Sequence, residues 1–360
     1  MPRPDQAADL GRRSYDFRAP IEPTSALATE PLLVRLADTR AFRRLRTVRF
    51  LGAIDYLRVP TPNGKPGSRR YTRHQHSLGV ARLALLYCQL KQIAGDERLL
   101  ILCAALLHDI GHAPLSHSLE PLFKQQFGMD HHKATEALVT GQAALGREVH
   151  AALREARVDV ERLVAVIGGR DPGHDGFFSG PINFDTIEGI LRTQTYEKPA
   201  PRASSPDTVV TAALNRTDDD DRIAVDDFWL YKDLVYRFII NSEAGLLADA
   251  VCQSFMRRHL HKFGPDDVFR SEVALFRQLP GLRQLLTSPD FTQRARQELG
   301  SAVSFKARRF TVDPAGDFFM REDKLRYQQI KTDSRLDIDD RDPLADRELS
   351  MDLFDDDARD

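Results

Sequence analysis

The sequence predicts a mainly α-helical protein with a smaller α+β region near the C-terminal end. Apolar residues recur at helical spacing over most of residues 31–262. The sequence lacks the alternation of strands and helices that would indicate a parallel sheet. The chain has 360 residues, of which 42% are hydrophobic and 29% charged. This balance suits a globular protein and excludes collagen-like and wholly disordered chains. No run reaches the roughly 18 apolar residues of a membrane helix. The polar start lacks a signal core, so we expect a cytoplasmic protein without membrane contact.

The expected elements follow in order along the chain. Residues 1–30, rich in proline, alanine and charge, are interpreted as an N-terminal arm. The segment 38–51 has a helical stripe that Gly52 would end, and the proline- and glycine-rich segment 61–70 is expected to be a loop insertion. Further helices are expected over residues 77–93, 97–112, 116–127, 131–140, 143–156, 159–167 and 184–193. The helix 97–112 is apolar nearly all round, which favours burial in the middle of a helical domain.

The second half of the chain is less regular. Residues 197–222 lose periodicity and are interpreted as a surface insertion. A helical pattern returns at 226–262 and completes the core 31–262. The region 263–332 mixes helix with strands expected at VSFKARRFTV and FFMRE. Residues 333–360 contain 12 acidic and four basic residues, and we expect an acidic, disordered tail.

The candidate metal ligands are histidines and carboxylates, because Cys88, Cys103 and Cys252 have neither pairing nor metal spacing. Seven of the 11 histidines lie between residues 74 and 132. Among them, His108 and Asp109 end an apolar helix. A buried carboxylate is costly unless it is paired or bound to a cation. A divalent ion suits both side chains, although such a pair taken alone is more often an ordinary helix end.

Two more residues of the same types stand at helix ends. His76 begins the helix before His108, and Asp185 begins the helix 184–193. Alone, Asp185 would be an ordinary N-terminal carboxylate. Together with His108 and Asp109 they form a set of two histidines and two carboxylates that predicts a divalent metal site.

Four segments resemble the HD superfamily of metal-dependent phosphohydrolases. They are RLRTVRFLG (44–52), RHQHSLGVARLA (73–84), AALLHDIGHAPLSHSLE (104–120) and, in part, FDTIEGILR (184–192). The resemblance covers about residues 38–262, apart from the two insertions. It is strongest to the deoxynucleoside triphosphate triphosphohydrolase branch, which includes the sterile-alpha-motif/HD enzymes. It implies an HD-domain helical core, a nucleotide substrate and a homo-oligomer.

The resemblance also implies roles for individual residues. The metal ligands would be His76, His108, Asp109 and Asp185, holding one divalent ion (Mn, Fe, Mg, Zn or Co), with a second metal as an option. The catalytic histidine would be His117, with Glu120 as its partner, and His131 the next active-site histidine, with His132 as its competitor. Phosphate would be bound by Arg73 and Lys232, which replaces an arginine, and His112 would bind phosphate or support the metal ligands.

Three positions depart from the family pattern. Gly189 and Ile240 stand where the family has tyrosines, and Thr193 where it has an aspartate. These positions read the deoxyribose in the family. The sequence therefore predicts a phosphohydrolase with altered sugar recognition.

Two alternatives remain open. A phosphodiesterase or nuclease on this scaffold would cut cyclic nucleotides or single-stranded nucleic acid. A basic stripe would serve it, formed by Arg40, Arg43, Arg44, Arg46 and Arg49, although such a stripe is more often a solvated or oligomer-facing surface. The other alternative is a nucleotide-sensing module without catalysis. The complete ligand set argues against that alternative, since a sensor would tolerate loss of Asp109.

Overall fold

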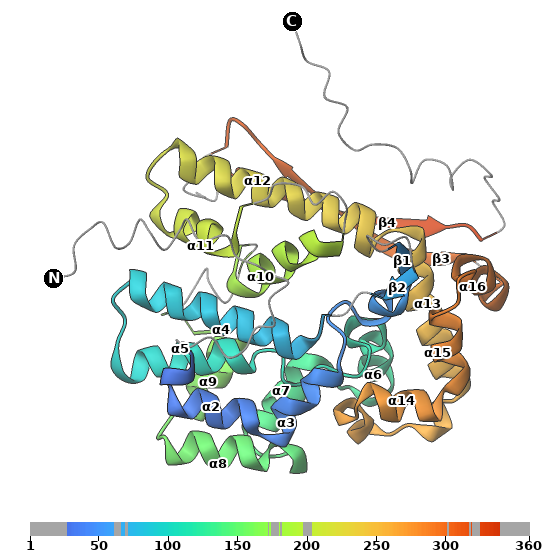
Figure 1. Cartoon of the computed structure of the whole chain (residues 1–360), viewed down its shortest axis with the longest axis horizontal. Coiled ribbons are helices and arrows are strands. Elements are labelled where there is room, and N and C mark those ends of the chain that lie inside the picture. The colour runs from blue at the N-terminus through green and yellow to red at the C-terminus, as the bar shows by residue number, and fades with distance from the viewer. Residues whose placement is uncertain are drawn as a thin grey trace, which may run out of the picture.

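The computed structural model describes residues 27–60, 66–68, 71–171, 173, 180, 182–196, 204–300, 302–316, 318 and 325–338. Within them the protein is mainly α-helical with two antiparallel ribbons, so the predicted fold class is confirmed (Figure 1). No helix in this part of the chain combines the length and apolar character needed to cross a bilayer.

The helices fall into two groups along the chain. The first contains α2 (Pro31–Asp38), α3 (Arg40–Arg44), α4 (Arg73–Leu90), α5 (Gly95–Leu107), α6 (Glu120–Phe127), α7 (His131–Val139), α8 (Arg147–Glu155), α9 (Val160–Ile167) and α10 (Phe184–Arg192). The second contains α11 (Pro206–Asn215), α12 (Asp219–Val235), α13 (Glu243–Arg258), α14 (Glu272–Gln278), α15 (Pro280–Leu286) and α16 (Phe291–Leu299). The strands are β1 (Arg58–Pro60), β2 (Pro66–Ser68), β3 (Val303–Val312) and β4 (Tyr327–Leu336).

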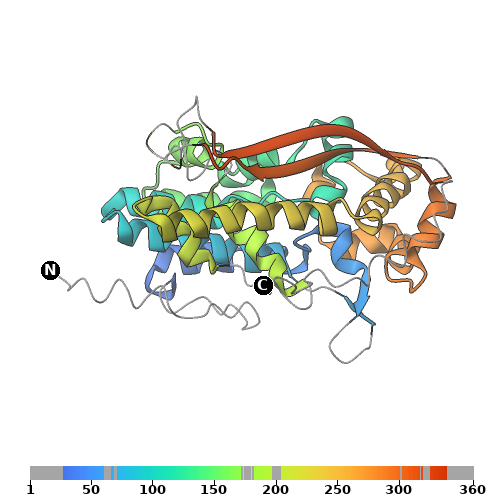
Figure 2. The same cartoon turned by 90° about the horizontal axis from the view of Figure 1, so that it is seen from above.

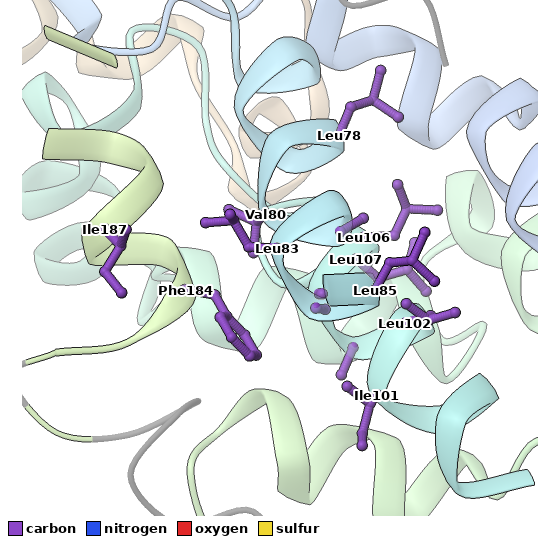
Figure 3. Close-up of a cluster of buried hydrophobic side chains, with 14 of the residues drawn as sticks. Leu78, Val80, Leu83, Leu85, Ile101, Leu102, Leu106, Leu107, Phe184 and Ile187 are labelled. Carbon is purple, nitrogen blue, oxygen red and sulfur yellow. The ribbon is translucent and has the colours of Figure 1, made fainter. Parts of the chain in front are cut away.

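Helices α4 and α5 form the centre of the core. They are joined by a short connection and pack against each other, with α10 on the other side of α4. Figure 3 shows the buried side chains between them, including Leu83 of α4, Leu106 of α5 and Phe184 of α10. Every residue of α5 from Leu100 to Leu107 is buried, as its all-round apolar pattern predicts. Each fully buried leucine contributes about 1.5–3 kcal/mol to the hydrophobic stabilisation.

The single helix expected over 38–51 is wrong. Helix α3 ends at Arg44, and a 3₁₀ turn follows. Residues 48–50 then run alongside 71–73, where the Phe50 amide donates to the Tyr71 carbonyl at 3.1 Å and the Arg73 amide to the Val48 carbonyl at 2.9 Å. This tertiary pairing outweighs the local helical stripe. It also places Phe50 beside the start of α4.

The second half differs from expectation in two places. Part of the expected insertion 197–222 is helical, because Ser205 caps α11 and Val209 and Val210 bury its inner face. The helical pattern expected from residue 226 begins earlier, with α12 at Asp219, and continues through α13. A π-helical turn, Tyr236–Ile240, separates α12 from α13, and the Ser242 side chain caps α13.

The C-terminal ribbon is longer than expected. The predicted strand 303–312 is β3, and it pairs along its whole length with β4. Strand β4 includes residues 333–336, which we expected in the acidic tail. Their charges are compatible with the strand because Asp333 lies opposite Lys306 and pairs with it at 2.9 Å. The expected arm up to residue 26, most of 61–70 and of FFMRE, and the tail beyond 338 lie outside the described residues.

Candidate metal and active site

The pairing of α4 and α5 brings the start of one helix and the end of the other together. His76 lies in the first turn of α4, which opens with a capping box between Thr72 and Gln75. His108 directly follows α5, and its Nδ1 lies 2.8 Å from the carbonyl oxygen of Ala105. A proton on Nδ1 makes that hydrogen bond and leaves Nε2 of His108 available to a ligand.

Asp109 and Asp185 complete the metal quartet (His76, His108, Asp109 and Asp185). Asn183 caps α10 by accepting from the Thr186 amide at 2.8 Å, so Asp185 is not needed as the cap. Nε2 of His76 lies 2.9 Å from Asp185 Oδ1 and 3.5 Å from Asp109 Oδ2. One ligand atom from each member lies within 4.8 Å of all the others. The structure thus brings together the four residues that the sequence analysis selected.

The electrostatics of the quartet favour a bound cation. Burial opposes charge on His108, but Asp109 and Asp185 outweigh it and raise the pKa of His108 to about 9. Burial would raise the pKa of Asp109, yet His108 and its other cationic neighbours hold it well below the usual value. A divalent ion would offset the negative charge of these carboxylates in place of the protonated histidine. Nε2 of His108 is buried and has no hydrogen-bond partner in the described part of the chain, which fits a metal-ligand atom.

Glu188 contacts the ring nitrogen of His76 that faces away from the quartet. The sequence did not lead us to predict this residue. Its buried carboxylate lies 2.5 Å from Nδ1 of His76 and also pairs with Arg192, four residues further along α10. A Cβ atom at Gly79 would overlap this carboxylate, which explains the glycine on the facing side of α4. The available signal was an acidic residue one helical turn after Asp185.

A second cluster lies beside the quartet and contains His112, His117, Glu120 and His131, whose ligand atoms also lie within 4.8 Å of one another. Glu120 stands between two histidines, 3.1 Å from Nδ1 of His117 and 2.7 Å from Nδ1 of His131. His131 stacks on His112 with ring centroids 4.4 Å apart. His132 is exposed and outside this cluster. Of the two competing residues, the structure places His131 with the catalytic candidates.

Two histidines of this cluster, His112 and His117, have a lowered pKa. Burial and the nearby Arg73 hold the pKa of His112 well below its usual value. Neutral His112 can donate from Nε2 to Oδ1 of Asp109, 3.1 Å away. His117 has a largely exposed side chain, and the desolvation that lowers its pKa is opposed by Glu120. His112 therefore supports a metal-ligand candidate, and His117 has a carboxylate partner suited to a proton-transfer role.

The two clusters border a cavity of about 370 Å³ whose walls also contain both predicted phosphate-binding residues. Arg73 is buried and donates to Asp109 Oδ2 at 2.7 Å and to Ser116 Oγ at 3.1 Å. The Lys232 ammonium lies 4.5 Å from the Trp229 ring centroid and 4.7 Å from that of Phe310. Burial lowers the pKa of Lys232 to about 8.

The three departing positions line the same cavity. A Cβ atom at Gly189 would lie 3.2 Å from Cζ of Phe50, so this ring fills the space beside the glycine. The Thr193 hydroxyl donates to the Ile190 carbonyl at 2.6 Å. Ile240 contributes only an apolar surface. These three positions therefore present few groups that could read a sugar hydroxyl.

The basic stripe is largely engaged within the protein. Arg40 and Arg43 pair with Glu148 and Asp38. Arg44 donates to two backbone carbonyls of the HDIGH turn, each at 2.8 Å. These contacts stabilise the loop that carries Asp109 and weaken the case for a free nucleic-acid surface.

Comparison with known proteins agrees with the motif analysis. Residues 73–165 match the HD domain model. The uncharacterized protein YwfO of Bacillus subtilis is 35% identical over 175 residues, 46% of this chain and 37% of that protein. The deoxynucleoside triphosphate triphosphohydrolase SAMHD1 of Gallus gallus is 36% identical over 116 residues, 29% of this chain and 18% of that protein. The matched part thus spans well under half the length of these relatives.

Two solved structures share the fold. A hypothetical protein from Aquifex aeolicus has a TM-score of 0.61 at 18% identity, covering 84% of this chain and 90% of that chain. A phosphohydrolase from Bacteroides thetaiotaomicron has a TM-score of 0.58 at 16% identity, covering 84% of this chain and 94% of its own. The helical arrangement therefore extends well beyond the matched HD segment.

Proposed function

We propose that this chain, which contains an HD domain and resembles the deoxynucleoside triphosphate triphosphohydrolase branch, is a metal-dependent hydrolase of nucleotide phosphate esters or anhydrides. The proposed substrate is a nucleoside triphosphate, of the ribo or deoxy series. One observation carries the proposal: Asp109 and Asp185 of the metal quartet line a cavity whose walls also hold Arg73 and Lys232. Metal ligands and phosphate-binding cations thus face one space.

The residues of the chain divide the work of hydrolysis. A divalent ion, when bound by the quartet, supplies Lewis-acid stabilisation of a phosphate oxygen and lowers the pKa of water. Arg73 and Lys232 offset negative charge on the phosphate chain. His117, oriented by Glu120, donates a proton to the leaving oxygen. His131 shares Glu120 with His117, and against the effect of burial the two histidines together lower the pKa of that carboxylate.

We propose further that the enzyme distinguishes deoxyribose from ribose only weakly. Gly189 and Ile240 have no polar side-chain group, and the Thr193 hydroxyl donates within its own helix. A site that hydrogen-bonds a sugar hydroxyl can discriminate by several orders of magnitude, whereas an apolar wall gives roughly 10- to 200-fold. We therefore expect a preference between deoxyribose and ribose of roughly 200-fold or less.

The test combines metal analysis of the purified protein with a screen of products from each deoxynucleotide and its ribonucleotide. Bound divalent metal and hydrolysis of both series, with kcat/KM values within about a thousandfold of each other, support the proposal. A larger preference for the deoxy form would contradict weak sugar discrimination. Cleavage of cyclic nucleotides or single-stranded nucleic acid alone would favour the phosphodiesterase or nuclease alternative. Nucleotide binding without turnover would favour the nucleotide-sensing module. Size-exclusion chromatography with light scattering tests the proposed homo-oligomer.

A further inference from the structure

The β3–β4 hairpin is fixed against α12 beside the active-site cavity. Figure 2 shows the two strands as a long ribbon running along this helix. Trp229 Nε1 lies 3.1 Å from the Thr311 carbonyl and 3.2 Å from that of Gln328, one on each strand. Asp233 accepts from the Phe310 amide at 2.8 Å. The hairpin is therefore a rigid wall, anchored through the same helix that carries Lys232.

One face of the hairpin borders the cavity. Side chains alternate between the two faces of a strand, and Arg308 and Phe310 of β3 both line the cavity, as does Gln329 of β4. Gln329 is paired with Phe310, and Lys331 with Arg308. Arg308 is thus a cation on the cavity wall, and the sequence analysis did not select it.

The charges on this face are not balanced within the hairpin. Lys306 pairs with Asp333 at 2.9 Å, but Arg308 lies directly opposite Lys331. Like charges at directly opposed positions destabilise a strand pair. In the part of the chain that the structure describes, no carboxylate lies within ion-pair distance of Arg308 or Lys331. Arg308 donates to the Tyr236 hydroxyl at 3.3 Å, a contact that leaves its charge without a counterion.

Lys232 is close to both Arg308 and the Asp185 carboxylate of the quartet. Beyond the effect of burial, its pKa is raised by Asp185 and lowered by Arg308, so it is close enough to both to respond to their charge. Arg73, Lys232 and Arg308 all line the cavity of about 370 Å³. Arg73 is paired with Asp109 at the quartet, whereas Lys232 of α12 and Arg308 of β3 lie on other walls of the same cavity, so a chain of phosphates extending from the quartet would meet all three cations.

We propose that Arg308 is a specificity-determining residue that binds the phosphate farthest from the metal quartet in a polyphosphate chain. This inference rests on the proposed function, since it concerns the same cavity. The guanidinium fork would hold two oxygens of that phosphate, and Lys232 the phosphate before it. The cavity would then prefer a triphosphate to a monophosphate.

The test is calorimetric binding of inorganic tripolyphosphate and orthophosphate to the full chain. A divalent ion is kept in excess of the polyphosphate, so that chelation does not strip the site. Arg308→Gln should weaken tripolyphosphate binding by about 10- to 100-fold, the loss expected for a charge-assisted hydrogen-bonded pair. Orthophosphate binding should change by less than about twofold. The tripolyphosphate affinity of Arg308→Lys should lie between those of the wild type and Arg308→Gln, because lysine keeps the charge but lacks the guanidinium fork.

Lys306→Gln is the matched control, because it removes a cation from the same strand that is paired with Asp333. Tripolyphosphate affinity should stay at the wild-type value in this variant. Thermal melts of all variants show that each one folds. An unchanged tripolyphosphate affinity in Arg308→Gln overturns the inference, as does an equal loss for both anions or the absence of binding to the wild type.

The two proposals fail separately. Selective loss of tripolyphosphate binding in Arg308→Gln supports the hairpin's role even where no nucleotide is hydrolysed, a result that would refute the proposed function alone. Conversely, normal hydrolysis of nucleotides by Arg308→Gln with unchanged KM refutes the inference and leaves the proposed function intact.

Discussion

Nδ1 of His76 lies 2.5 Å from a carboxylate oxygen of Glu188, while Nε2 of the same ring lies 2.9 Å from Asp185. A proton held on Nδ1 by Glu188 leaves the Nε2 lone pair for a metal ion. Glu188 is itself buried and paired with Arg192. The orientation of one metal-ligand candidate is thus set by a charged pair that lies behind it.

Glu188→Gln tests this positioning role. The amide keeps the size of the side chain but loses the charge that favours a proton on Nδ1 of His76. Metal affinity should fall by about 10- to 100-fold, measured by competition with a chromophoric chelator, while circular dichroism stays at the wild-type helical signal. Glu161→Gln, an exposed change on α9, serves as the control. Equal metal affinities in the two variants would contradict the role.

Gly79→Ala tests the close packing of α4 against the same carboxylate. The added Cβ atom would overlap Glu188, which is held by two charged partners and cannot move freely. The free energy of unfolding should fall by about 1–3 kcal/mol, measured by urea denaturation. In Gly281→Ala the new atom would make an ordinary 3.4 Å contact with Phe255, so that variant should remain within about 1 kcal/mol of wild type. A neutral Gly79→Ala would show that α10 can shift.

These residues illustrate what the sequence could predict about the site. The quartet was found because its members stand at helix ends that short motifs mark. Glu188 was missed because its role depends on α10 packing against α4, more than 100 residues earlier in the chain. The same limit applies to residues 48–50, whose pairing with 71–73 replaced an expected helical turn. Local periodicity carries no information about such partners.

Asp109→Asn tests the metal quartet itself. Replacing the carboxylate removes an anionic ligand while nearly preserving its volume, so both bound metal and turnover should be lost. Far-UV circular dichroism should retain the helical signal, because α4 and α5 keep their apolar contacts. Asp96→Asn, in the first turn of α5, should change neither property. Stoichiometric metal in the purified Asp109→Asn protein would refute the assignment.

The C-terminal hairpin shows a second limit of sequence reasoning. β3 was predicted as a strand, but β4 was not, and it is exposed along most of its length and mainly polar. Its strand conformation comes from pairing with β3 and from Trp229, which contacts both strands. Composition therefore assigned residues 333–336 to the tail, and the cavity residues Arg308 and Gln329 went unnoticed.

Two truncations separate the hairpin from the acidic tail. Removing residues 339–360 keeps Ile338, whose carbonyl accepts from Arg296 at 2.6 Å, and turnover should stay within about threefold because acidic residues do not attract an anionic substrate. Removing 334–360 also deletes the end of β4, and the melting temperature should fall by about 2–4 °C for each kcal/mol lost. A hundredfold loss of turnover in the shorter deletion would show that the tail completes the site or the assembly.

The pH dependence of substrate capture provides a test of Lys232. Burial lowers its pKa to about 8, with Asp185 opposing this shift and Arg308 adding to it. Lys232 is therefore cationic below that pH and loses its charge as the pH rises through 8. Since the cation holds phosphate, kcat/KM should decline on the alkaline side with a midpoint near this value.

Lys232→Arg should remove this alkaline decline, because a guanidinium stays charged throughout the accessible range. Lys124→Arg, a change at an exposed residue paired with Asp130, should retain it. The measurement is kcat/KM for a nucleoside triphosphate from pH 6 to 10 at saturating divalent ion. The substitution should act on KM more than on kcat, since Lys232 holds substrate and donates no proton. A wild-type profile that is flat on the alkaline side would contradict the titration of Lys232 during substrate capture, and the same midpoint in Lys232→Arg would assign the decline to another group.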